Sequence, residues 1–193
     1  MAILTKRPYP LRYQAAKQLD CDIIEKPGGN GKIAAVYGRV SSGLQAIQSI
    51  YANQRQRDMA TKASDMNYSG IISIFADLQG VSGALGPEHR PGFALLCQLV
   101  EEGIADDVFV MDFTRLVRDH IIGLDFAQIC IKEHARIIDE TGRILDPSDK
   151  VGLILYVIQL SESVEERNRI NSRLQISRRK KAEQGRNPGM SIA

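Results

Sequence analysis

Residues 37–45 have the sequence Tyr37-Gly38-Arg39-Val40-Ser41-Ser42-Gly43-Leu44-Gln45, and the expected fold is organised around this stretch. The apolar run at 33–37 predicts a buried strand, and the polar residues that follow predict a loop at its end. In parallel α/β sheets, ligands usually bind at the carboxyl ends of the strands. A hydroxyl nucleophile at Ser41, two residues after Arg39, would suit attack on an anionic phosphate. The alternative interpretation is an ordinary strand followed by a serine-rich turn.

The composition is that of a soluble globular protein with an uneven distribution of charge. The chain has 193 residues and a formal net charge of +2, but basic residues collect near its C-terminal end, with a smaller group near the start. This asymmetry indicates a polyanionic partner, although a solvated charged face would look the same. Isolated cysteines and scattered histidines predict no metal site and no disulfide framework. No stretch is long and apolar enough to cross a membrane, so we expect a cytoplasmic protein.

Strand and helix patterns alternate along the chain, which predicts an α/β fold with a mostly parallel central sheet and helices on both faces. We expect strands at 33–37, 71–75, 108–111 and 136–139, and helices at about 46–66, 92–103 and 121–134. Pro91 can open the second of these helices. The segment before residue 33 is harder to assign: a short helix at 11–19 and a flexible connection at 27–32 are expected.

A long projecting C-terminal helix is predicted from about Ser148 to Gln184, because this segment contains no proline and only one glycine. Asp149 or Ser148 could cap its start. Its first half carries more apolar surface than one small domain would cover, and its second half is polar and basic. We expect the first half to pack against a partner subunit and the second half to contact nucleic acid. A core helix with a solvated end is the alternative.

Arginine follows three of the predicted strands, as Arg39, as Arg90, and as the pair Arg115 and Arg118, which would share one face if helical. Guanidinium groups are fixed bidentate donors to phosphate, and a cluster of them lowers the cost of ionising a hydroxyl. Phosphoryl transfer to a serine needs such charge stabilisation on the phosphate oxygens. No His–Asp pair lies in these segments, so a protease-like triad is not predicted.

The order of these motifs resembles the serine recombinase family, which includes resolvases, invertases and large serine integrases. The family pattern Tyr-x-Arg-Val-Ser-Ser-x-x-Gln is matched within 37–45, and Arg-Leu-x-Arg-Asp is matched at 115–119. The family segment Asp…Ser-Gly…Arg-Pro-Gly is similar to Asp77, Ser82-Gly83 and Arg90-Pro91-Gly92. Its Glu-Arg and Gly-Arg-x-Pro-Gly motifs are similar to Glu166-Arg167 and to residues 185–189. The resemblance covers about 33–189.

The resemblance implies that Ser41 attacks a DNA phosphodiester and forms a 5′-phosphoserine link, leaving a free 3′-hydroxyl. Gln45 would organise the loop, Ser82 would lie near the DNA backbone, and four arginines would bind the scissile phosphate: Arg39, Arg90, Arg115 and Arg118. Arg115 is also a candidate for proton transfer. The ester retains the bond energy, so no cofactor or metal is implied. The long helix would contact DNA through Arg167, Arg173, Arg178, Arg179, Lys180 and Arg186.

Family members work on double-stranded DNA as dimers that assemble into tetramers, in bacteria and phages, and the resemblance implies the same here. We expect an N-terminal extension of unknown role at 1–32, a resolvase-like catalytic domain at 33–147, a helix for oligomerisation and DNA contact at 148–186, and a tail at 187–193 without a separate DNA-binding domain. One residue departs from the pattern: Thr114 stands where the family usually has Asp, which removes a carboxylate that could position an arginine.

The favoured interpretation is therefore the catalytic domain of a site-specific DNA recombinase, with activity that Thr114 and the short C-terminus could reduce. An alternative is a catalytically silent oligomerisation or DNA-binding module that pairs with a full-length recombinase. A third interpretation is a phosphate-binding α/β protein that acts on small molecules. It retains Ser41 and the arginines but does not explain the long helix.

Overall fold

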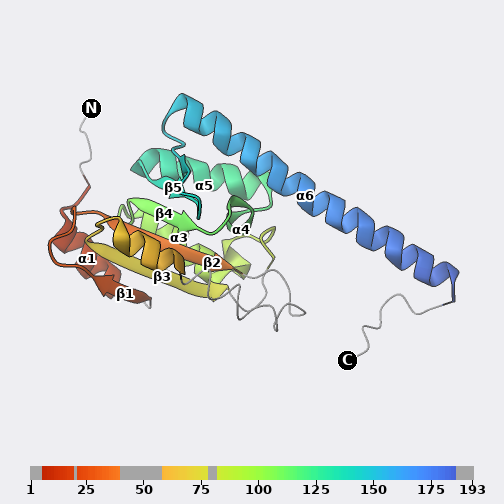
Figure 1. Cartoon of the computed structure of the whole chain (residues 1–193), viewed down its shortest axis with the longest axis horizontal. Coiled ribbons are helices and arrows are strands. Elements are labelled where there is room, and N and C mark those ends of the chain that lie inside the picture. The colour runs from red at the N-terminus through yellow and green to blue at the C-terminus, as the bar shows by residue number, and fades with distance from the viewer. Residues whose placement is uncertain (1–5, 20, 40–57, 78–81, 186–193) are drawn as a thin grey trace.

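A single mixed sheet forms the centre of the molecule. The structure is a computed structural model that describes residues 6–19, 21–39, 58–77 and 82–185 (Figure 1). Within these residues, six strands pair in the order β1-β3-β2-β4-β5-β6. They are β1 Asp22–Glu25, β2 Ile33–Arg39, β3 Gly70–Asp77, β4 Asp107–Val110, β5 Arg136–Ile138 and β6 Ile144–Leu145. The four central strands are parallel, and β1 and β6 are antiparallel edge strands. The predicted mostly parallel sheet is confirmed.

The helices alternate with the parallel strands as the sequence predicts. They are α1 Tyr9–Lys17, α3 Pro91–Glu101, α4 Phe113–Leu116, α5 His120–Glu133 and α6 Lys150–Glu183, with a short 3-10 turn η2 at Pro87–His89. Residues 58–65 are also helical, which confirms that part of the expected 46–66 helix. Residue 66 is in a turn, and 46–57 lie outside the described residues. Pro91 opens α3, as predicted. The sequence did not predict β1, β6 or the single turn of α4.

The core lies on both faces of the sheet because successive residues of a strand point to opposite sides. In β2, Ile33, Ala35 and Tyr37 belong to a cluster that α3, α5 and α6 cover. The intervening Ala34 and Val36 belong to a second cluster, which residues of the 58–65 helix complete. Helices therefore cover both faces, which confirms the predicted layering and explains why the whole of β2 is buried.

The segment before β2 joins the same sheet. β1 pairs with β3 and so covers the edge of the parallel strands. Arg12 in α1 is buried, and its guanidinium donates to the Asp106 carboxylate at 2.5 Å and to the Gly31 carbonyl at 2.6 Å. The Gly31 amide donates to Ser69 Oγ at 2.7 Å. We expected a flexible connection at 27–32, but these contacts hold it against the end of the sheet.

The long helix α6 has 34 residues, which corresponds to about 51 Å, and it projects beyond the body (Figure 1). Asp149 caps its start, because the carboxylate accepts from the amides of Val151 and Gly152. In the first half, Tyr156, Leu160 and Val164 form a buried stripe against the same chain, while Val151 and Ile154 are 64% and 60% exposed. The expectation that this half packs against a partner is therefore corrected for one stripe, which packs on the chain's own domain.

Replacing Tyr156 with phenylalanine is expected to make stability less sensitive to alkali. Burial raises the pKa of the Tyr156 phenol, and its hydroxyl donates to the Gly123 carbonyl at 2.6 Å. Above pH 10 the unfolded chain loses this proton and the folded chain keeps it, so the free energy of unfolding falls by up to about 1.4 kcal/mol per pH unit for this residue. Denaturant unfolding at several pH values between 8 and 11 should show a shallower decline for the variant. Parallel declines would contradict the assignment.

Candidate active site

The candidate site lies where the parallel strands end. Arg39 is the last residue of β2 and Asp77 is the last residue of β3, and the two are paired in register. The short helix α4 follows β4, the other neighbour of β2. Because parallel strands end at one edge of the sheet, residues far apart in sequence come together here. The four arginines expected from sequence all take part in contacts at this edge, Arg39, Arg90 and Arg118 through their side chains and Arg115 through its carbonyl.

Helix α4 holds the arginines through its carbonyl oxygens. Arg39 donates from Nε to the Arg115 carbonyl at 2.9 Å and from Nη2 to the Thr114 carbonyl at 3.2 Å. Arg118 donates from Nε to the same Thr114 carbonyl at 3.0 Å. The last carbonyls of a helix have no partner within it, and arginine side chains often satisfy them. Two guanidinium groups therefore meet at one carbonyl oxygen.

Arg115 and Arg118 do not share the face of one helix, although their spacing would allow it. Helix α4 ends at Leu116, and the next residue, Val117, is extended with φ −142° and ψ 150°. Arg118 therefore lies in the link to α5, and Asp119 caps α5 by accepting from the amides of Ile121 and Ile122. The extended link directs the Arg118 side chain back toward α4.

Positive charge is concentrated at this edge of the sheet. Arg39 is fully buried, and its pKa falls to about 9, first because burial disfavours the charged form and then because Arg118, Arg90 and Arg115 repel it. Burial also lowers the pKa of Arg118, and the positive charges of Arg115 and Arg167 add to this effect. A site with such an excess of positive charge favours an anionic ligand, whose charge would offset the repulsion.

The Ser82-Gly83 segment lies directly on the Arg39 guanidinium. A Cβ at Gly83 would be 2.8 Å from Arg39 Nη2 and 2.9 Å from Cζ, which is too close for any side chain. The Gly83 carbonyl accepts from the Arg118 amide at 2.8 Å. Ser82 itself is exposed, and its Oγ accepts from the Ala84 amide at 3.3 Å. Gly83 therefore allows the close packing that joins this segment to two of the arginines.

Replacing Gly83 with alanine is expected to displace the Arg39 guanidinium, because the added Cβ would lie 2.8 Å from Nη2. The buried, hydrogen-bonded side chain cannot move without loss of its contact with the Arg115 carbonyl. A small displacement of a catalytic group slows a reaction more than it weakens binding. We expect a reaction at this site to slow about tenfold with little change in ligand affinity, as measured by single-turnover kinetics and equilibrium binding. A variant that reacts at the wild-type rate would show that Arg39 can move aside without loss.

Arg90 is fully buried, like Arg39, and its charge acts on Arg39 from the interior of the domain. Its side chain is fully buried, and Nη2 donates to the Tyr37 hydroxyl at 2.6 Å and to the Leu116 carbonyl at 2.7 Å. Its guanidinium carbon is 4.1 Å from the centre of the Phe93 ring. Leu116 is the last residue of α4, so Arg90 contacts α4 from inside the domain.

Helix α6 contacts the same region from outside. Ser163 donates from Oγ to the Val117 carbonyl at 2.7 Å, and Arg167 donates from Nη1 to the Arg118 carbonyl at 3.4 Å. Glu166 lies 3.9 Å from the Arg118 guanidinium. Arg167, which we expected to contact DNA, is thus a part-buried contact between α6 and the arginine cluster. The start of the projecting half of α6 is fixed to the site.

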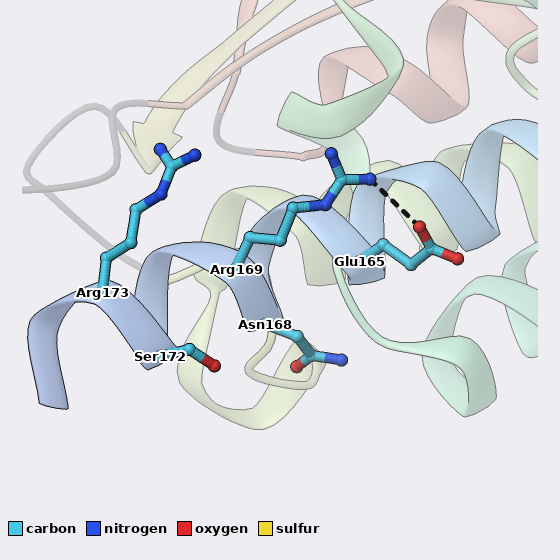
Figure 2. Close-up of a pocket in the computed structure, with 5 residues that line it drawn as sticks. All are labelled: Glu165, Asn168, Arg169, Ser172 and Arg173. Carbon is cyan, nitrogen blue, oxygen red and sulfur yellow. Dashed lines mark hydrogen bonds and ion pairs between the residues drawn. The ribbon is translucent and has the colours of Figure 1, made fainter. Parts of the chain in front are cut away.

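The second half of α6 presents exposed cations. Arg173, Arg178, Arg179 and Lys180 are all exposed. Figure 2 shows Arg169 and Arg173 extending from the same side of the helix, with Arg169 paired to Glu165 at 3.1 Å. These residues, together with Asn168 and Ser172, line a shallow hollow along the helix. The predicted division of α6 into an apolar half and a basic half is present in the structure.

The family model for the resolvase N-terminal domain matches residues 34–187, which is most of the chain. The chain belongs to this family. Among solved structures, the N-terminal catalytic domain of TP901-1 integrase is similar, with 22% identity, a TM-score of 0.51, and coverage of 71% of this chain and 98% of that one. A resolvase family site-specific recombinase from Streptococcus pneumoniae has 20% identity, a TM-score of 0.51, and coverage of 79% and 99%. These identities show a common fold. No curated protein matches the chain.

Several residues expected in this resolvase-family site lie outside the described residues. They are Ser41, Gln45 and Arg186. Within the described part of the chain, no cluster of histidine, cysteine, aspartate and glutamate could hold a metal ion. No helix in that part is long and apolar enough to cross a membrane. Arg39 is the last described residue before Ser41.

Sequence reasoning missed Asp112 in this resolvase-family site, and it gave Asp77 only as a motif match without a role. Asp112 caps α4 by accepting from the Thr114 amide at 2.7 Å, and its charge also acts to raise the pKa of Arg118. Asp77 is fully buried and accepts from the Tyr37 hydroxyl at 2.6 Å. Thr114 itself takes part through its carbonyl, which any residue could supply. A signal for Asp112 was available, because an Asp directly before a short polar helix is a common cap.

Proposed function

We propose that this chain breaks and rejoins DNA strands with Ser41 as the nucleophile. The observation that carries the proposal is that Arg39 and Arg118 meet at the Thr114 carbonyl in a chain of the resolvase family. Arg39 lies two residues before Ser41. Ser41 Oγ would give up its proton and form a bond to the phosphorus of a phosphodiester, and the bond from phosphorus to the 3′ oxygen would break, so that one proton is lost at the serine and one is gained at the 3′ oxygen. The 3′ oxygen takes a proton and leaves as a free hydroxyl. The 5′-phosphoserine ester keeps the bond energy for rejoining.

The arginines would stabilise the charge that develops on the phosphate oxygens. Arg115 and Arg118 are half-buried, so they can reach a ligand, and each guanidinium offers bidentate donors. Arg115 is also our candidate for proton transfer to the departing oxygen. Arg39 is buried behind them, and with a pKa near 9 it is charged at neutral pH. Its positive charge so close to the serine segment would favour an alkoxide at Ser41 and the anionic transition state.

Helix α6 supports the DNA and oligomer parts of the proposal. Its exposed basic half would make sequence-tolerant contacts to the phosphates of double-stranded DNA. The exposed apolar side chains of its first half, Val151, Ile154 and Ile158, would pack against a second copy of the chain, giving a homodimer that forms a tetramer on DNA. We place this activity in the cytoplasm of a bacterium or of a phage-infected cell, where the DNA is accessible.

Covalent trapping tests the proposed function. Supercoiled plasmid is incubated at low salt with the wild type, with Ser41→Ala, and with Ser42→Ala as a matched control on the neighbouring serine. Protein linked to 5′ DNA ends is then sought on a denaturing gel. We expect an adduct with the wild type and with Ser42→Ala but not with Ser41→Ala. An adduct that survives in Ser41→Ala, or its absence in the wild type over a range of DNA and with a full-length relative added, would contradict the proposal.

A further inference from the structure

A buried polar network lies directly beneath α4. The Tyr37 hydroxyl donates to Asp77 Oδ2 at 2.6 Å and accepts from Arg90 Nη2 at 2.6 Å. Tyr37, Asp77 and Arg90 are each at most 1% exposed. Buried polar groups are costly unless they are paired, so such a network holds its members in one arrangement. The three residues come from β2, from β3 and from the turn before α3.

The network fixes where helix α3 begins, directly after Arg90. Asp77 accepts from the amides of Gly92 and Phe93 at 2.9 and 3.1 Å, so a carboxylate from β3 caps the start of α3. A Cβ at Gly92 would be 3.0 Å from the Asp77 carboxyl carbon, which is why the residue after Pro91 must be small. The Arg-Pro-Gly motif therefore serves packing: each of its three residues adjoins or builds this capped helix start.

The network also fixes where α4 ends. Arg90 donates to the carbonyl of Leu116, the last residue of α4, at 2.7 Å. The two preceding carbonyls, of Thr114 and Arg115, hold the Arg39 and Arg118 side chains from the other side. A shift of Leu116 would move these carbonyls and both guanidinium groups with them. Arg90 Nε is buried, makes no hydrogen bond and lies 3.7 Å from Asp77 Oδ2. Because the whole Arg90 side chain is fully buried, none of its donors is exposed to a phosphate.

We propose that Tyr37, Asp77 and Arg90 form a positioning unit, which sets α4 and thereby Arg39 and Arg118, and that Arg90 acts in strand cleavage without touching the phosphate. This inference rests on the proposed function for its kinetic consequences. It differs from what the family resemblance implies for Arg90, which is direct phosphate binding. It also assigns Tyr37 and Asp77 a positioning role in strand cleavage.

Two conservative variants separate positioning from phosphate binding. Tyr37→Phe keeps the ring but removes the hydroxyl, and Arg90→Lys keeps the charge but cannot bridge Tyr37 and Leu116. We expect each to slow cleavage about tenfold or more, and the double variant to be no slower than the slower single variant, because the residues act as one unit. DNA affinity and its dependence on salt should stay at wild-type values in both. If Arg90→Lys fails to fold, Tyr37→Phe still carries the test.

A second readout needs no DNA. The Arg39 Nε–H group donates to the Arg115 carbonyl, so in ¹⁵N-arginine-labelled protein its exchange with water reports on α4. The signal is assigned by its loss in Arg39→Lys. We expect exchange at least tenfold faster in Tyr37→Phe and in Arg90→Lys, and unchanged exchange in the control Tyr13→Phe on α1. A merely stabilising residue elsewhere would not move this signal under conditions where the protein is folded.

The opposite pattern would overturn the inference. If Arg90→Lys reduced the salt dependence of DNA binding by about 0.9, the value for one lost phosphate contact, while Tyr37→Phe cleaved at the wild-type rate, Arg90 would be a phosphate ligand. Unchanged Arg39 exchange in both variants would also overturn it. Failure of the proposed function looks different, because the wild type would then form no Ser41-dependent adduct while the exchange measurement would still decide the positioning role.

Discussion

Arg39→Lys is expected to slow DNA strand cleavage by about 10²–10³-fold, a loss of the size seen when one preorganised electrostatic group of an active site is removed, because the fixed positive charge beside Ser41 would no longer be held in place. The native guanidinium donates from Nε to the Arg115 carbonyl and from Nη2 to the Thr114 carbonyl at the same time. A lysine has one ammonium group, which cannot reproduce this planar fork and keep a fixed position beside Ser41. The measurement is the single-turnover rate of adduct formation on supercoiled DNA.

The control for this prediction is Arg143→Lys. Arg143 pairs with Asp139 at 3.1 Å and donates to Gln159 at 3.0 Å, so it is also a bidentate arginine, but it belongs to no proposed contact with DNA. We expect its cleavage rate to stay within twofold of the wild type. Equal losses in the two variants would mean that any bidentate arginine matters for stability and that Arg39 has no special part in the reaction.

The parallel sheet could be predicted because its strands are apolar runs. Residues 33–37 and 71–75 are buried on both faces, and such strands show as continuous apolar segments in a sequence. β1 and β6 could not be predicted in this way. β1 carries Asp22 and Glu25 at its ends, and β6 has only two residues, so neither gives a pattern. Their strand structure comes from pairing with β3 and β5.

The meeting of Arg39 and Arg118 could also be predicted in outline, because each follows a buried parallel strand and such strands end at one edge. Which of the arginines are buried could not be predicted. The burial of Arg90 depends on Tyr37 and Asp77, which lie 53 and 13 residues earlier in the chain, and no local pattern reveals that pairing. Arg118 is separated from α4 because Val117 is extended. The sequence around Val117 is also compatible with a helix, so it does not reveal this break.

The basic half of α6 is expected to dominate DNA affinity. Arg173, Arg178, Arg179 and Lys180 are exposed on a helix that projects from the body (Figure 1). Each phosphate contact contributes about 0.9 to the slope of log K against log salt concentration. Arg173 and Lys180 are seven residues apart and share one face, whereas Arg178 and Arg179 lie on others. Changing all four to glutamine should therefore reduce the slope by about 2 to 4 and weaken binding at low salt by about 10²–10³-fold.

The control removes the same charge from the body, by changing Lys17, Lys32, Lys132 and Arg143, which are all exposed, to glutamine. Both variants lose four positive charges, so both lose the same long-range attraction to DNA. Only the α6 variant loses cations that lie together along the projecting part of one helix, where they can contact successive phosphates (Figure 1). We expect the body variant to change the slope by less than about 1. Equal slopes in the two variants, measured by fluorescence anisotropy with duplex DNA, would mean that net charge alone attracts DNA and that α6 has no defined contact.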